Sequence, residues 1–137
     1  MPWSPGASGW GTPDNVYSLG AFELAPDEAL VVAGRSPRCT YWGVQLWNRY
    51  MQSLDYRHHR VSLNGVQAAL ETDGSFRVVI AERDPGIANW LQTAGYREGL
   101  FFCRWLQAEE MPNPLSTEVV RISDLSQRSG LTPKRST

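Results

Sequence analysis

The sequence predicts a single all-β domain, built as an antiparallel sandwich or a barrel. Roughly seven or eight short runs rich in aromatic and β-branched residues recur along the chain, with turn residues between them. The 12 glycines and 9 prolines fit many tight turns, and no segment sustains the period of a helix. A chain of 137 residues suits one domain and can bury a core without metal or disulfide staples.

The expected strands follow from runs of β-forming residues, at 17–23, 29–34, 39–48, 59–63, 67–71, 75–81, 99–106 and 119–122. The run at 29–34 is wholly apolar, which is typical of a strand buried on both faces. The runs at 39–48 and 99–106 are dense in aromatic residues, which makes them the clearest strands.

Turn residues separate these runs. Asn64-Gly65 and Asp73-Gly74 are expected to close hairpins, because both dipeptides favour the tight turns that join antiparallel strands. Asp84-Pro85-Gly86 is expected to form another turn. Residues 50–56 and 87–96 lack clean alternation and are expected to be loops or single helical turns.

The two ends are predicted to lie outside the folded domain. Residues 1–14 are rich in Pro, Gly and Ser and are expected to form a disordered lead, although Trp3 and Trp10 could dock on the domain or a partner. Residues 15–125 form the predicted domain, and the polar residues 126–137 form a flexible tail.

Composition excludes several classes of partner. The formal net charge is -1 with both signs mixed along the chain, so nucleic acid is not an expected partner. The apolar runs are too short to cross a bilayer, and the N-terminus lacks the basic and apolar regions of a secretory signal. These features favour a soluble, cytoplasmic protein that does not bind membranes, unless an upstream part is missing.

No metal or cofactor is expected. The one histidine pair, His58-His59, would face opposite sides of a strand, so a solvated basic patch with Arg57 and Arg60 is the favoured interpretation. Glycine loops of the nucleotide-binding type are absent. Cys39 and Cys103 lie in or beside apolar runs and are expected to be buried, reduced thiols, with pairing between them left open.

The strongest functional feature is the alternation within residues 39–48 and 99–106. Successive side chains of a strand point to opposite faces. One face of these strands is an ordinary core face, carrying Trp42, Val44, Leu46, Phe101, Cys103 and Trp105. The opposite face mixes rings with polar groups, carrying Tyr41, Gln45, Trp47, Phe102 and Arg104. This mixed face is expected either to be covered by a second packing layer or a domain interface, with Arg104 paired to a carboxylate, or to line a ligand cleft.

A second candidate segment runs from Asp84 to Leu91. Asp84 and Asn89 can cap turns, and Trp90 can plug the end of a sandwich. Alternatively, Asn89 and Trp90 lie at the rim of the mixed face and contact a ligand. The candidate ligand-binding residues are therefore Tyr41, Gln45, Trp47, Asn48, Asp84, Asn89, Trp90 and Arg104. A carboxylate pair for sugar hydrolysis would come from Asp55, Glu82 and Asp84, a weak signal.

The chain also resembles the domain of unknown function family 1214, the C-terminal domain of proteins whose first part is family 1254. The resemblance covers about residues 15–125 and rests on Asp27-Glu28-Ala29-Leu30, on 41–48 (Tyr-Trp-Gly-Val-Gln-Leu-Trp-Asn), on Asp73-Gly74-Ser75, on Asp84-Pro85-Gly86 with Asn89-Trp90-Leu91, and on Gly99 with Arg104-Trp105. It implies a bacterial-type, antiparallel jelly-roll-like β-sandwich with little helix that usually follows other sequence. It implies no established activity. Ala88 and Gln92 depart from the family pattern, in which Pro and Asp are common.

Three functions remain open. The first is a non-catalytic interaction domain whose mixed face packs on an upstream domain or on another copy of the chain. The second is an enzyme, or half of one, that acts on a small or carbohydrate-like substrate through Asp55, Asp84, Asn89 and Arg104. The third is a carbohydrate-binding module with Trp47 and Trp90 as stacking platforms. The sequence does not decide whether the chain is catalytic.

Overall fold

The computed structural model describes residues 4–5, 15–55, 57–65, 68–70, 74–110, 112 and 114–127, and these are mostly β. They form β1 (Ser4–Pro5), β2 (Asn15–Glu23), β3 (Glu28–Gly34), β4 (Tyr41–Trp47), β5 (Ser62–Asn64), β6 (Phe76–Ala81), β7 (Trp90–Gln92), β8 (Glu98–Leu106), β9 (Ser116–Arg121) and the short 3-10 helix η1 (Ile122–Gln127). The all-β prediction is confirmed. No helix in the described ranges is long and apolar enough to cross a membrane.

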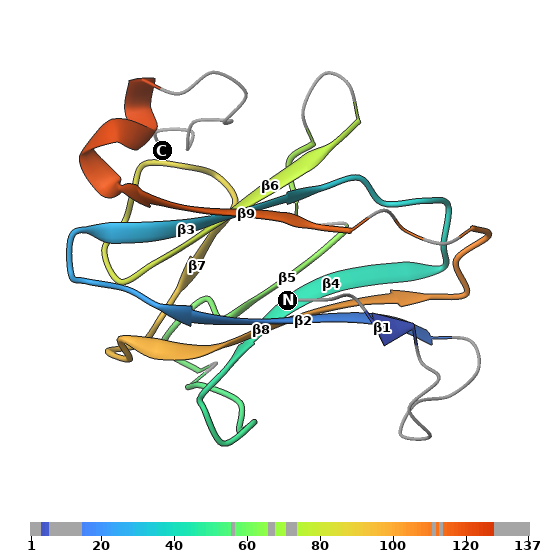
Figure 1. The fold of residues 1–137 in the computed structure, drawn as a ribbon, viewed down its shortest axis with the longest axis horizontal. Coiled ribbons are helices and arrows are strands. Elements are labelled where there is room, and N and C mark those ends of the chain that lie inside the picture. Colours follow the sequence, from blue (N-terminus) through green and yellow to red (C-terminus); the bar gives the residue numbers. More distant parts are fainter. Residues whose placement is uncertain are drawn as a thin grey trace.

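The strands form two sheets that lie one above the other (Figure 1). One sheet has five strands in the order β1-β2-β8-β4-β5, and the other has four in the order β7-β6-β3-β9. Neighbouring strands are antiparallel except β6 and β7, which are parallel. β8 lies at the centre of the five-stranded sheet, between β2 and β4, so its outward side chains are flanked on both sides.

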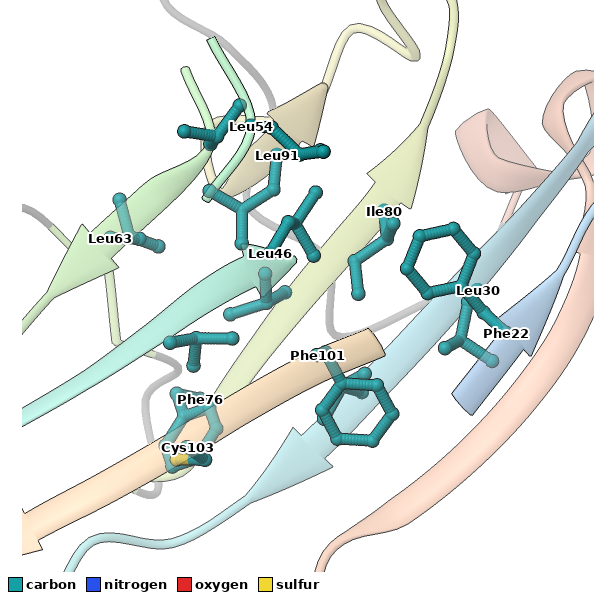
Figure 2. Close-up of a cluster of buried hydrophobic side chains, with 14 of the residues drawn as sticks. Phe22, Leu30, Leu46, Leu54, Leu63, Phe76, Ile80, Leu91, Phe101 and Cys103 are labelled. Carbon is teal, nitrogen blue, oxygen red and sulfur yellow. The ribbon is translucent and has the colours of Figure 1, made fainter. Parts of the chain in front are cut away.

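One hydrophobic cluster fills the space between the sheets (Figure 2). The five-stranded sheet contributes Phe22, Trp42, Val44, Leu46, Phe101, Cys103 and Trp105, and the four-stranded sheet contributes Leu30, Val32, Phe76, Val78, Ile80 and Leu91. The predicted core face of residues 39–48 and 99–106 is therefore confirmed. Fully burying each large apolar side chain stabilises the fold by about 1.5–3 kcal/mol.

The four-stranded sheet is buried on its far face as well. There a second cluster contains Ala29, Val31, Val79, Ala81, Ile87 and Leu125. Leu125 belongs to η1 and is only 1% exposed, so the short helix covers the outside of β3 and β6. The prediction that residues 29–34 are buried on both faces is confirmed for residues 29–32, whereas Ala33 and Gly34 are half-buried.

The two predicted hairpins are not found among the described residues. β5 pairs with β4, and β6 lies between β7 and β3, so neither pairs with described residues 68–70. Described residues 68–70 are not a strand. The backbone of Ala69 instead bonds to the side chain of Asn89, at 2.8 Å from its N–H and 2.7 Å from its C=O. These side-chain bonds replace the ladder that a hairpin would have made.

Three segments are more ordered than predicted. Residues 87–96 contain β7, because its apolar Leu91 is fully buried in the main cluster. The predicted tail begins inside η1, which Leu125 anchors. In the predicted lead, Ser4 and Pro5 pair with β2. The rest of the lead with Trp3 and Trp10, residues 67 and 71–73 of the predicted hairpins, and residues 128–137 lie outside the described residues.

The two cysteines are free thiols. Cys103 is fully buried in the main cluster and Cys39 is half-buried beside it. Burial raises the pKa of Cys103, because an apolar surrounding disfavours the thiolate. Cys103 is therefore a small apolar core residue, as predicted.

Candidate functional site

The solvent side of the five-stranded sheet carries the mixed face that the sequence predicts. It presents Tyr17 from β2, Tyr41, Gln45 and Trp47 from β4, and Phe102 and Arg104 from β8; we call this surface the outer face. The register places Tyr17 opposite Arg104, and Gln45 opposite Phe102. Strand pairing therefore brings together residues that are far apart in the chain.

Three rings on the outer face form a stacked row. The Tyr17 and Phe102 ring centroids lie 5.1 Å apart with an interplanar angle of 29°. The Trp47 and Phe102 centroids lie 4.7 Å apart at 14°. Such stacks contribute about 0.5–1.5 kcal/mol beyond area burial, so each ring helps to fix its neighbour. The row is a half-buried, preformed aromatic surface.

Arg104 lies beside this row and is exposed. Its guanidinium carbon lies 5.4 Å from the centroid of the Tyr41 ring, a cation–π contact. No described carboxylate forms an ion pair with Arg104, so the carboxylate expected to pair with it is not found among the described residues. Gly43 stands opposite Arg104 on β4. A Cβ at Gly43 would lie 2.7 Å from the Tyr41 hydroxyl, so only a residue without a side chain leaves room for the Tyr41 ring in this position.

An open depression of about 370 Å³ lies on this surface. It is lined by Tyr41, Gln45, Trp47, Phe102 and Arg104, together with Gly43, Val44, Val61 and Ser62. The Gln45 amide donates to the Ser53 hydroxyl at 3.1 Å, which helps to fix the position of its side chain. Of the eight candidate residues, the structure brings these four together: Tyr41, Gln45, Trp47 and Arg104.

Asn48 follows directly after β4 but serves the adjoining loop. Its side-chain oxygen accepts hydrogen bonds from the N–H groups of Tyr50 and Gln52, at 2.9 and 3.1 Å. Its amide donates to the Gln52 side chain at 3.0 Å. These bonds hold a tight turn in which Met51 adopts a φ of 63°. Asn48 is thus committed to loop structure.

Asp84, Asn89 and Trp90 lie away from the outer face. Trp90 begins β7, a strand of the four-stranded sheet, and Asp84 and Asn89 lie in the segment that leads into β7. Asn89 is 2% exposed, and besides Ala69 it donates to the Arg77 carbonyl at 3.0 Å. The Trp90 indole N–H donates to the Ala81 carbonyl at 2.9 Å and its ring packs on the second cluster. Asp84 accepts a hydrogen bond from the Gly86 N–H at 2.9 Å. These residues do not reach the rim of the outer face.

The other titratable groups make separate local contacts. The His58 ring bonds to Asp55 at 2.9 Å, and this hydrogen bond lowers the pKa of Asp55. The His59 ring bonds to Gln92 at 2.8 Å. Glu82 accepts hydrogen bonds from the Thr93 hydroxyl and, at 2.8 Å, from the Gly95 N–H. Across the described ranges, no group of three or more His, Cys, Asp or Glu could hold a metal ion.

Sequence reasoning missed Tyr17 as a member of the outer face. Residues 17–23 were predicted to form a strand, but the partner strand and its register were not predicted. β2 pairs with β8, and no local signal in either segment specifies that pairing. The four-residue core of the site could be predicted because its members lie on two strands with clear alternation.

Comparisons with known proteins identify a shared fold. No protein-family model and no curated protein matches the chain. The structure is similar to that of an uncharacterised protein from Burkholderia cenocepacia, with 41% identity over 85% of this chain and a TM-score of 0.80. It is also similar to a protein from Vibrio parahaemolyticus, with 17% identity over 82% of this chain and a TM-score of 0.64. The chain spans 32% of the length of each, about a third.

Proposed function

We propose that this domain is a non-catalytic interaction module whose outer face packs against another region of a longer polypeptide. The observation that carries the proposal is the stacked row of Tyr17, Phe102 and Trp47 on the solvent side of the five-stranded sheet. The three rings are half-buried, and Trp47 and Phe102 line the open depression. A partner that covered it would remove large apolar area from water.

The composition of the outer face supports an interface. Buried cores of protein interfaces are enriched in Tyr, Trp, Phe and Arg and depleted in Lys, Glu and Asp. The outer face holds each of the four enriched types around the open depression. Rings held by stacking lose little entropy on binding, which favours association.

The length of the related structures supports the choice of partner. In the protein from Burkholderia cenocepacia, the matched part is 32% of the chain. By analogy, we place the covering region in sequence of the same molecule that lies outside the matched domain. The resemblance to the domain of unknown function family 1214 supports the same arrangement, as does a jelly-roll-like sandwich fold, which we propose from two sheets sharing one core. A second copy of the chain is the alternative occupant.

The other two functions receive less support. An enzyme would need Asp84, Asn89 and Arg104 to act together, but Asn89 is buried in the other sheet with its amide fully engaged. A carbohydrate-binding module would need two platforms, yet Trp90 packs on the second cluster. The open depression beside Trp47 keeps a small-molecule or sugar ligand as the alternative at the outer face.

Hydroxyl-radical footprinting tests the proposal. The chain would be oxidised alone and within the full reading frame that encodes it, and oxidation would be quantified by mass spectrometry. Trp47, Phe102 and Tyr17 are expected to be several-fold less oxidised in the longer form. Tyr50, which is 69% exposed and outside the outer face, is the internal control and should not change.

Two other results would have clear meanings. Equal oxidation of the three ring residues in both forms would contradict the proposal. Protection that appears in the isolated chain as its concentration rises, together with a dimer in sedimentation, would make a second copy the occupant.

A further inference from the structure

The charges of the outer face are distributed unevenly. At one end, Arg49 forms an ion pair with Glu98 at 2.9 Å. Arg104 lies further along β8, roughly 20 Å from Glu98 at the rise of an extended strand. Within the described ranges, Arg104 has a cation–π contact and no acidic partner. The face therefore carries one cation whose charge the described residues do not balance.

The surroundings of Arg104 leave its guanidinium open to a ligand. Tyr41 lies beneath it, and Tyr17 flanks it on β2. On the β4 side the opposing residue is Gly43, whose lack of a side chain leaves the depression open. A guanidinium presents a planar set of N–H donors that fits the two oxygens of a carboxylate.

Covering the aromatic row has a consequence for Arg104, because the two share one surface. Burying a charge without a partner is strongly unfavourable, whereas a charge paired by hydrogen bonds is tolerated. A partner that covers Phe102 and Trp47 also removes water from the neighbouring Arg104. The covering surface must therefore bring an anion.

We infer that the partner region presents an Asp or Glu side chain, next to an apolar or aromatic one, and that its carboxylate bonds to Arg104 while the apolar group lies on Trp47 and Phe102. This inference rests on the proposed function and specifies its partner. A single free cation matches the single charge of a carboxylate. A phosphate group with a charge near two would be left half-balanced. The pair is a charge-assisted, bidentate contact that sets orientation.

Matched peptides test the inference on the full chain. The probes are N-acetyl-Trp-Glu-amide and N-acetyl-Trp-Gln-amide, which differ in charge and little in shape. Binding would be followed by NMR at the Arg104 Nε–H and the Trp47 indole N–H. The Glu peptide is expected to shift both signals and to bind about tenfold more tightly than the Gln peptide, the usual gain from a charged hydrogen bond. Sodium acetate, which lacks the ring, should bind more weakly than the Glu peptide.

Variants make the result specific. Arg104→Met keeps the aliphatic stem and should abolish the difference between the two peptides. Arg60→Met removes an exposed arginine outside the outer face and should preserve that difference. Equal binding of both peptides to the unaltered chain, or no shift with either, would contradict the inferred contact between Arg104 and a carboxylate. The proposed function is judged separately by footprinting, since an uncharged partner would still protect Trp47, Phe102 and Tyr17.

Discussion

Asn48 and Asn89 carry the same side chain and were both candidate ligand residues, yet their environments differ. Asn48 is half-exposed and holds a loop, whereas Asn89 is buried and bonds three backbone groups of Ala69 and Arg77. An amide has donors and an acceptor together, so it can replace a missing strand neighbour for residues 68–70. The role of each asparagine depends on the backbone that lies within reach of its side chain.

We expect Asn89→Ala to lower the free energy of unfolding by about 2–3 kcal/mol, because the substitution leaves buried backbone groups without partners. Urea denaturation followed by tryptophan fluorescence would measure the change. Asn48→Ala is the matched control, with an expected loss below about 1 kcal/mol in an exposed loop. A similar loss for the two variants would mean that the bonds of Asn89 are not structural.

The elements show where sequence patterns suffice and where they fail. β2, β3, β4, β6 and β8 coincide closely with predicted runs, because each has enough β-branched and aromatic residues to bury one face or both. β9 overlaps the predicted run 119–122 only at residues 119–121, and its residues are almost all exposed. β7 was missed because three residues between turn signals carry almost no period. The strand expected at 67–71, between Asn64-Gly65 and Asp73-Gly74, was wrong for its described residues 68–70, because a turn signal does not specify which strand lies next to a given strand.

The same limit applies to the candidate site. Alternation predicted that Tyr41, Gln45, Trp47 and Arg104 share a surface, and this is confirmed by the pairing of β4 with β8. Asn89 and Trp90 looked equally suitable as polar and aromatic ligand residues. Whether Asn89 and Trp90 reach the outer face depends on which sheet their segment joins, and this is a long-range property of the fold.

Gly20 shows how one element accommodates another. On β2 it stands opposite Phe101 of β8, and a Cβ there would lie 2.2 Å from the Phe101 ring. We expect Gly20→Ala to cost about 1–3 kcal/mol of unfolding free energy, as overpacking of a core usually does. Adding Phe101→Leu should recover part of this cost, giving a double-mutant cycle with a clear coupling energy. Ala21→Val, on the exposed side of β2, is the control and should change little.

At the scale of the whole molecule, each sheet pairs strands that come from opposite ends of the described chain. Asn15 of β2 pairs with Leu106, and Glu28 of β3 pairs with Arg121. The one cluster between the sheets draws on strands from β2 to β8. Neither sheet can bury its inner face before these distant segments meet, which is typical of cooperative β folds with non-local contacts.

Truncation tests this dependence. Deleting residues 116–137 removes β9 and η1, which exposes the edge of β3 and takes Leu125 away from the second cluster. The second cluster covers one face of the four-stranded sheet, and the other face of that sheet contributes to the main cluster. Loss of the second cluster should therefore destabilise both sheets. We therefore expect the truncated chain to lose its cooperative unfolding transition. Deleting residues 128–137 leaves every described element in place and should keep one transition, coincident by far-ultraviolet circular dichroism and tryptophan fluorescence. A cooperative transition in the shorter chain would instead mean that the five-stranded sheet is stable without β9 and η1, and the outer face could then be studied on that smaller unit.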